Sequence, residues 1–136
     1  MLIDSNILVY AFNTSSPKHK KAQGFIQNNI GNLEIAHQNI FETLRVLTHP
    51  KFSSPMNPKE AVEAVFRISK TCRLIYPDYK TAPLALAFVE RHNLSADRIF
   101  DGYLVATAIS NDVKVIVTDN VKDFQKFPIK VFNPFS

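Results

Sequence analysis

The sequence predicts an α/β fold, and three of its features carry that prediction. Short apolar runs alternate with amphipathic segments of about ten residues, which is the pattern of βαβ units around a parallel sheet. The clearest run lies within Lys114–Thr118 and is apolar without alternation, as expected for a strand buried on both faces. The length of 136 residues, with 46% hydrophobic and 21% charged residues, indicates one globular domain over residues 1–136 and excludes wholesale disorder.

The expected elements follow from the local pattern in chain order. Leu2-Ile3 is a short first strand, after which Ser5 or Asn6 can cap a helix that continues through Tyr10. Later helices are expected where apolar residues recur at intervals of three and four and where Pro, Asn or Ser offers a start. These helices cover Pro17 to about Asn29, Gln38–Thr48, Pro58–Ser69 after an Asn57 cap, Thr81–His92, and a stretch from a Ser95 cap to about Ser110. The remaining strand candidates are Leu33–Ala36, Arg73–Tyr76, Lys114–Thr118 and Ile129–Phe132.

Composition excludes several classes of protein. A single cysteine, Cys72, rules out an intramolecular disulfide and a thiolate zinc cluster, and it suits a reducing cytoplasm. No apolar run approaches the ~20 residues that span a bilayer, and the first residues do not resemble a signal peptide, so no membrane association is expected. Lys and Arg total 16 against 12 Asp and Glu, and the net charge of +4 permits attraction to nucleic acid without establishing it.

Acidic residues follow two of the expected strands. Asp4 comes directly after Leu2-Ile3, and Asp119 comes directly after Lys114–Thr118. Ligands of open parallel sheets collect beyond the carboxyl ends of the strands, so adjacent strands would bring both carboxylates to one edge. Each acid taken alone is equally well explained as the cap of a following helix.

Two further acids lie within expected helices. Asp101 shares a helical stripe with Leu104, Val105 and Ala108, where a carboxylate is costly unless it is paired or binds a metal. The alternative is a first-turn position, in which an acid complements the helix dipole. Glu42 lies opposite the apolar residues of its helix, so periodicity alone favours a solvated surface charge.

Converging acids without clustered histidines or cysteines indicate a hard divalent cation. Oxygen ligands select Mg²⁺ or Mn²⁺ over zinc, and the four histidines show no zinc-binding spacing. The three glycines cannot form either of the common glycine-rich phosphate loops. A magnesium or manganese site is therefore the expected chemistry.

Four segments together resemble the PIN-domain ribonucleases, specifically toxins of the VapC type. They are Met1–Tyr10 (MLIDSNILVY), Glu42–Thr48 (ETLRVLT), Ile99–Ala106 (IFDGYLVA) and Val117–Phe124 (VTDNVKDF). Each segment is unspecific alone, whereas their order and spacing over nearly the whole chain are typical of that family. The resemblance implies a PIN-like three-layer sandwich, in which helices flank a short central parallel sheet.

The resemblance also implies an activity. Such a protein is an endoribonuclease that depends on Mg²⁺ or Mn²⁺, cuts RNA such as tRNA or rRNA, and stops translation. Asp4 and Asp101 would hold the metal directly. Glu42, together with an acid from the closing segment, would hold a second ion or orient its water.

The closing segment departs from the pattern of the family. The acid that usually stands two residues after the threonine is replaced here by Asn120, so either Asp119 or Asp123 supplies the fourth carboxylate. The residues expected to contact substrate are Asn6, Arg45, Thr118 and Asn120. The basic cluster from Lys18 to Lys21 is explained as well by a solvated helix start as by an RNA contact.

The expected partners come from the same resemblance. Family members generally form homodimers, and a small antitoxin protein holds them inactive by feeding a segment into the acidic groove. RNA, a cognate antitoxin and a second copy of the chain are therefore the expected partners.

Two other functions fit parts of the sequence. A haloacid-dehalogenase-like phosphatase also has an Asp after its first strand, but its chemistry needs an Asp where this chain has Asn6. A catalytically silent PIN-like module that binds RNA or protein fits the irregular position of Asn120.

Overall fold

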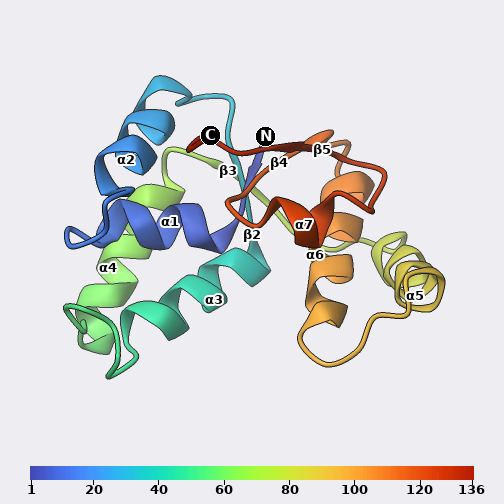
Figure 1. The fold of residues 1–136 in the computed structure, drawn as a ribbon, viewed down its shortest axis with the longest axis horizontal. Helices are drawn as coiled ribbons and strands as arrows, with labels where there is room; N and C mark the ends of the chain where they lie inside the picture. The colour runs from blue at the N-terminus through green and yellow to red at the C-terminus, as the bar shows by residue number, and fades with distance from the viewer.

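Five short parallel strands run through the middle of the molecule (Figure 1). The structure is a computed structural model that describes residues 1–136. Across the sheet the strands are β3 (Arg73–Ile75), β2 (Glu34–Ala36), β1 (Leu2–Ile3), β4 (Val115–Val117) and β5 (Lys130–Phe132). The chain builds outward from the central β1 to β3 and then returns to β4 on the other side of β1. The topology therefore switches between β1 and β4, which is where ligands bind in sheets of this kind.

Helices cover both faces of the sheet, because successive strand residues point to opposite sides. Leu2 and Ile116 belong to a core with α5 (Thr81–Arg91) and α6 (Arg98–Ser110). Ile3 and Val117 belong to a second core with the helices on the other face, α1 (Ser5–Phe12) and α2 (His19–Asn28). The predicted three-layer α/β sandwich with a short parallel sheet is confirmed.

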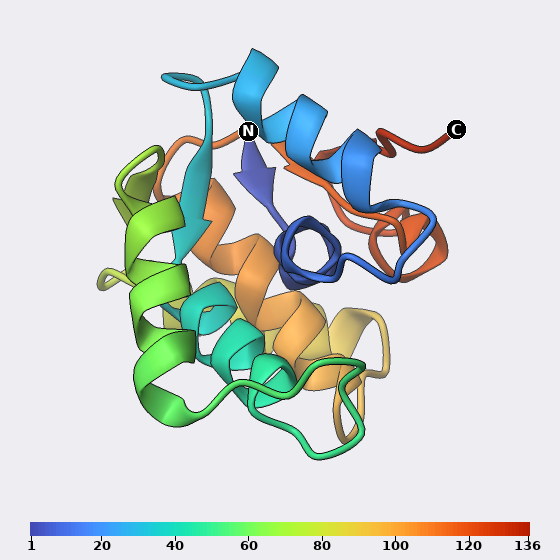
Figure 2. The same ribbon diagram turned by 90° about the vertical axis from the view of Figure 1, so that its left-hand side faces the viewer.

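The remaining helices complete the molecule around these layers. α1 is seen end-on in Figure 2 and packs against α2 on one side and against α3 (His37–Leu47) on the other. α3 in turn packs on α4 (Pro58–Ser69) through a small core of Leu47, Ala61 and Val65. α7 (Val121–Phe124) is a single turn after β4 and contacts α6. None of these helices has the length and apolar character needed to cross a membrane.

Two predicted helix caps are wrong, and one is confirmed. The cap of α1 is Asp4 instead of Ser5 or Asn6, because its carboxylate accepts the Ser5 N–H and the Ser5 hydroxyl is used elsewhere. Ser95 does not cap α6, because the chain turns at Ala96 with φ +50° and the helix begins only at Arg98. Asn57 does cap α4, and its Oδ1 accepts the N–H of Glu60 at 2.9 Å.

Candidate active site

Asp4 is the centre of the candidate site, and the sheet fixes its position. Its N–H donates to the carbonyl of Val117 at 2.9 Å, which joins the ends of β1 and β4. Its carboxylate accepts the Ser5 N–H at 2.8 Å and the Thr118 hydroxyl at 2.7 Å. The residue is only 7% exposed, so this carboxylate lies almost out of water with one neutral donor on each oxygen.

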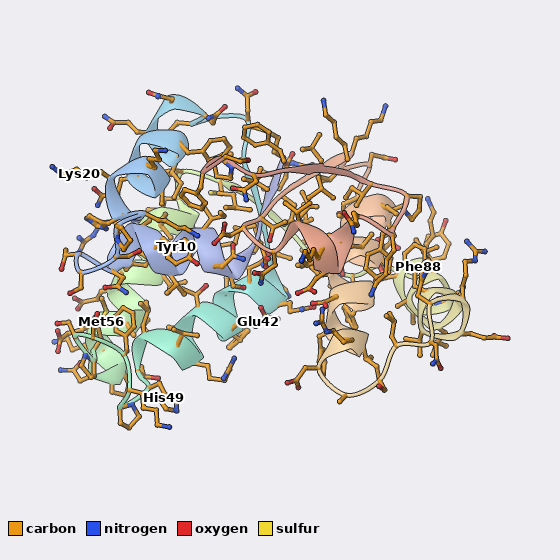
Figure 3. The ribbon with its side chains drawn as sticks, viewed as in Figure 1. Tyr10, Lys20, Glu42, His49, Met56 and Phe88 are labelled. Carbon is orange, nitrogen blue, oxygen red and sulfur yellow. The ribbon has the colours of Figure 1, made fainter.

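Glu42 lies on α3 (Figure 3), and Ser5 connects it to Asp4. Its two carboxylate oxygens accept hydrogen bonds from the Ser5 hydroxyl at 2.7 Å and from the Gln38 amide at 2.6 Å. The Gln38 amide also donates to the carbonyl of Phe100 at 3.1 Å, so it ties α3 to α6. Glu42 is therefore half-buried and hydrogen-bonded, and the interpretation of a solvated surface charge is wrong.

Glu42 is half-buried because α3 has a second buried face, and this face is polar. Asn39 and Thr43 have no exposed surface although neither is apolar. The Asn39 amide donates to the Ser5 hydroxyl at 3.3 Å, and its carbonyl oxygen accepts the N–H of Ala36 at 2.9 Å. A helical pattern that counts only apolar residues does not detect this face.

Asp101 and Asp123 approach the site from α6 and α7. Arg98, one turn before Asp101, lies between them, with its guanidinium 3.7 Å from a carboxylate oxygen of Asp101. The same guanidinium donates a hydrogen bond to Asp123. A cationic side chain of the protein thus links these two acids.

The acids act on one another through their charges. Burial, followed by the charges of Glu42 and Asp101, raises the pKa of Asp4 to about 6, although the hydrogen bonds from Thr118 and Ser5 oppose the shift. Burial, followed by the charge of Asp123, also raises the pKa of Asp101 to about 6, against the opposing effect of Arg98. Such clusters of desolvated acids with raised pKa values are characteristic of functional sites.

A groove of about 630 Å³ lies over part of this cluster, and it is lined by residues of α3 and of the start of α6. Glu42 and Asp101 line it, and Asp97 and Arg45 stand in the same lining. The anionic groups that line it are carboxylates, and their oxygens suit Mg²⁺ or Mn²⁺ better than zinc. No three of the His, Cys, Asp and Glu side chains form a ready coordination shell.

Asp119, at the end of β4, has a different set of partners. Its carboxylate accepts hydrogen bonds from the Tyr10 hydroxyl at 2.9 Å and from the Asn133 amide at 3.3 Å, and it forms an ion pair with Lys18. Lys18 is the main cause of its lowered pKa. β1 and β4 are adjacent, as predicted, yet Asp119 is engaged by α1, the start of α2 and the C-terminal segment instead of by the other acids.

Comparison with known proteins identifies the family. Residues 1–130 match the family model described as the PIN domain. This chain belongs to the PIN domain family. The expectation from the sequence motifs is therefore confirmed.

Individual proteins resemble this PIN domain over nearly their whole length. A Mycobacterium tuberculosis protein named Ribonuclease VapC24 is 28% identical over 145 residues, which cover 98% of this chain and 96% of the relative. A toxin–antitoxin complex from Klebsiella pneumoniae matches with a TM-score of 0.72 at 20% identity, over 98% of this chain and 96% of that one. DNA-bound VapBC from Salmonella typhimurium matches with a TM-score of 0.74 at 15% identity, with 98% and 96% covered.

The residues expected to contact substrate occupy two kinds of position in this PIN domain. Arg45 is exposed in the lining of the groove, and Asn120 is exposed at the start of α7. Thr118 is fully buried, and its hydroxyl, besides donating to Asp4, accepts hydrogen bonds from the Asn6 amide at 3.2 Å and the Asn120 N–H at 3.0 Å. Thr118 and Asn6 therefore act as supports that orient Asp4.

Sequence reasoning missed three residues that organise the site. Ser5 was interpreted only as a cap, yet it hydrogen-bonds both to Asp4 and to Glu42. Neither Gln38 nor Arg98 was predicted to belong to the site, because a single polar residue at a helix start has no distinctive pattern. The sequence did contain a signal for Arg98. It precedes Asp101 by three residues, and side chains three positions apart are neighbours on a helix.

Proposed function

We propose that this PIN domain is a metal-dependent endoribonuclease of the VapC type. It would hydrolyse phosphodiester bonds in RNA such as tRNA or rRNA and stop translation until an antitoxin protein binds it. The proposal is carried by Asp4, Glu42 and Asp101, which come from three different elements and act on one another through their charges. Burial and this repulsion raise the pKa of Asp4 and of Asp101. The similarity to a protein named as a ribonuclease supports it.

The metal ligands are assigned by their chemistry and their position. Asp4 and Asp101 would hold a Mg²⁺ or Mn²⁺ ion directly, while Glu42 and Asp123 would hold a second ion or orient water. We assign the fourth carboxylate to Asp123 instead of Asp119, because the charge of Asp123 acts on Asp101 whereas Asp119 is neutralised by Lys18. A divalent cation bound there would lower the pKa of water and offset charge on the phosphoryl oxygens during in-line attack.

The residues of the chain prepare this chemistry. Thr118 and Ser5 donate to the ionised form of Asp4, and so they favour the state that binds a cation. Ser5 and Gln38 hold the Glu42 carboxylate toward the same point. A carboxylate of this group accepts the proton of the attacking water.

RNA must approach an acidic site, so cationic and polar groups at its edge would position the backbone. Arg45 stands in the lining of the groove one turn from Glu42, and Asn120 is exposed beyond β4. Arginine pairs well with phosphate because its guanidinium can donate two parallel hydrogen bonds. We assign Arg45 and Asn120 to the RNA backbone on these grounds.

Cleavage of total RNA by the purified, partner-free protein tests the proposal. The protein is assayed with Mg²⁺, with Mn²⁺ and with a chelator, and Asp4→Asn and Asp101→Asn are compared with Asp112→Asn. Asp112 is an exposed acid just beyond the far end of α6, so its variant carries the same chemical change outside the groove. We expect discrete metal-dependent fragments from the wild type and Asp112→Asn, and none from the other two variants.

Two outcomes contradict the assignment. Cleavage by Asp101→Asn at the wild-type rate would remove the proposed metal ligand from the mechanism. Absence of cleavage by a well-folded wild type under every metal condition would instead favour a silent module that binds RNA or protein.

The proposed partners other than RNA are an antitoxin protein and a second copy of the chain. The likeness in fold to chains of toxin–antitoxin complexes supports the antitoxin. Light scattering of the purified chain, alone and with a candidate antitoxin protein, measures both associations. A strictly monomeric chain would exclude the homodimer.

A further inference from the structure

Arg98 is the cationic side chain that pairs with acids of the candidate site. Its guanidinium lies 3.7 Å from a carboxylate oxygen of Asp101 and donates a hydrogen bond to Asp123. The other ion pairs of the chain involve neither Asp4 nor Glu42. A single positive charge therefore stands between two carboxylates that come from different elements, α6 and α7.

The side chain of Arg98 is held loosely in this position. It is 54% exposed, and the two acids are the only groups with which it forms a hydrogen bond or an ion pair. The distance of 3.7 Å to Asp101 is longer than a hydrogen bond, so this link is an interaction of charges alone. Exposed ion pairs contribute little stability, because water solvates the separated partners well. A cation that binds carboxylates more strongly can therefore take the place of the guanidinium.

Lys18, which neutralises Asp119, is held in a different way. Its ammonium lies 5.3 Å from the centre of the Tyr10 ring and 5.2 Å from that of the Phe135 ring, in cation–π contact with both. The same carboxylate also accepts hydrogen bonds from the Tyr10 hydroxyl and the Asn133 amide. Removal of this ammonium would dismantle a whole network, whereas the ion pair between α6 and α7 can open alone.

We propose that Arg98 is an internal counter-ion that takes the place of a divalent cation between Asp101 and Asp123 and is displaced when the ion binds. This inference rests on the metal site of the proposed function and adds the step by which that site is loaded. A divalent cation balances two carboxylates, whereas one guanidinium leaves them half-neutralised. Mg²⁺ also approaches a carboxylate oxygen to about 2.1 Å, while a hydrogen-bonded nitrogen stays about 2.8 Å away. The ion therefore has the stronger attraction for the pair.

The exchange agrees with two features of the ion-free protein. A guanidinium between two carboxylates keeps their oxygens further apart than a shared ion would, and no three acids form a ready coordination shell. The charge of Asp123 acts unfavourably on the ionised form of Asp101, and the charge of Arg98 opposes this effect. Arg98 thus stabilises the ion-free fold, and it does so at the expense of affinity for the ion.

Titration with Mn²⁺ measures the competition, because electron paramagnetic resonance counts the ions that stay free. The wild type is compared with Arg98→Gln, which keeps a polar side chain and lacks the charge. Lys126→Gln is the matched control, since the charge of Lys126 also acts on Asp101 although Lys126 forms no ion pair with it. We expect Arg98→Gln to bind Mn²⁺ about three- to twentyfold more tightly than the wild type. The control should gain less than about twofold.

Nuclear magnetic resonance of the arginine side chains follows the displacement itself. The guanidinium signals of Arg98 are assigned by their absence from Arg98→Gln and are recorded while Mg²⁺ is added to the wild type. In the ion-free protein, the hydrogen bond to Asp123 should restrict rotation of the guanidinium. Saturating Mg²⁺ should produce the signals of a free side chain. Asp123→Asn, which removes the charged acceptor, should show these free signals without any ion.

Several results overturn the inference. Equal gains in Mn²⁺ affinity for Arg98→Gln and Lys126→Gln would show that only the general charge of the surface matters. Unchanged or weaker binding by Arg98→Gln would assign the arginine a structural role. Guanidinium signals that stay restricted at saturating Mg²⁺ would show that the ion binds without displacing it.

The outcome for the nuclease is read separately, from cleavage of RNA by the wild type. Metal-dependent cleavage together with any of these contrary results retains the nuclease and rejects the exchange. Displacement of Arg98 by Mg²⁺ without cleavage retains the exchange and rejects the nuclease. Absence of Mn²⁺ binding by both the wild type and Arg98→Gln rejects the exchange together with the metal site.

Discussion

Replacing Asp101 with asparagine removes a charge from the acidic groove and keeps the size of the side chain. In the ion-free protein, burial and the charge of Asp123 raise the pKa of Asp101 from 3.8 to about 6. A pKa difference of that size corresponds to about 3 kcal/mol of unfavourable free energy for the ionised form. The side chain is 24% exposed and stands in the first turn of α6, where a negative charge gains about 0.3–1 kcal/mol. We therefore expect Asp101→Asn to raise the free energy of unfolding by about 2 kcal/mol at pH 7.

The effect has a definite dependence on pH. Because the folded-state pKa lies above the unfolded value, the native protein binds more protons than the unfolded chain between about pH 4 and pH 6. The stability of the wild type therefore falls as the pH rises through this window, and it stays lower above it. Asp101→Asn lacks this contribution, so its advantage should be present at pH 7 and should vanish near pH 4.

Thermal denaturation in the presence of a chelator measures this difference. For a chain of 136 residues, 1 kcal/mol shifts Tm by about 3–4 °C, so the variant should melt about 6–8 °C higher at pH 7. Addition of Mg²⁺ should stabilise the wild type more than the variant, because the ion binds the folded wild type preferentially. A variant that melts at or below the wild-type temperature in chelator at pH 7 refutes the argument that Asp101 is held under electrostatic strain.

Three further substitutions test separate parts of the structure. Thr118→Val removes the donor to Asp4, so stability should fall by about 1–3 kcal/mol and the acid limb of the cleavage profile should move to higher pH; an unshifted limb contradicts the proposed support. Lys18→Met removes the main cause of the low pKa of Asp119, so the loss of stability as the pH falls toward and below about 4 should become shallower in acid titrations followed by circular dichroism. Gly24→Ala places a methyl group where no atom lies within 4 Å, within α2, and should raise stability by about 0.5–1 kcal/mol without affecting cleavage; a lower Tm would argue against open space there.

Most of the fold could be predicted from the sequence because the core residues of this protein come from short runs of apolar residues. β4 and α4 follow directly from an apolar run and from an Asn-Pro start, and both lie where they were expected. α7 was missed, since four residues cannot display a helical period. The false cap at Ser95 shows that a capping residue is evidence only when the chain after it turns immediately into a helix.

The candidate site was predictable where an acid contradicts its local pattern. Asp101 stood out because it lies on an apolar stripe, whereas Glu42 lies on a polar face whose burial depends on Ser5 and Asn39. Our proposal that Asp123 and not Asp119 supplies the fourth carboxylate could not be made from the sequence. It depends on an ion pair between residues 101 positions apart, Lys18 and Asp119, and no local pattern encodes such a contact.

The amide of Gln38 spans the distance between α3 and α6, and it shares its two donor contacts between the Glu42 carboxylate and the Phe100 backbone. Any ligand that pulls Glu42 toward the other acids competes for one of these contacts and loosens the other. Thermodynamic linkage requires the converse with equal strength, so whatever immobilises Phe100 must alter the affinity with which the acids hold their ion. A single amide thus couples the acids of the groove to the backbone at the start of α6 without any movement of the sheet.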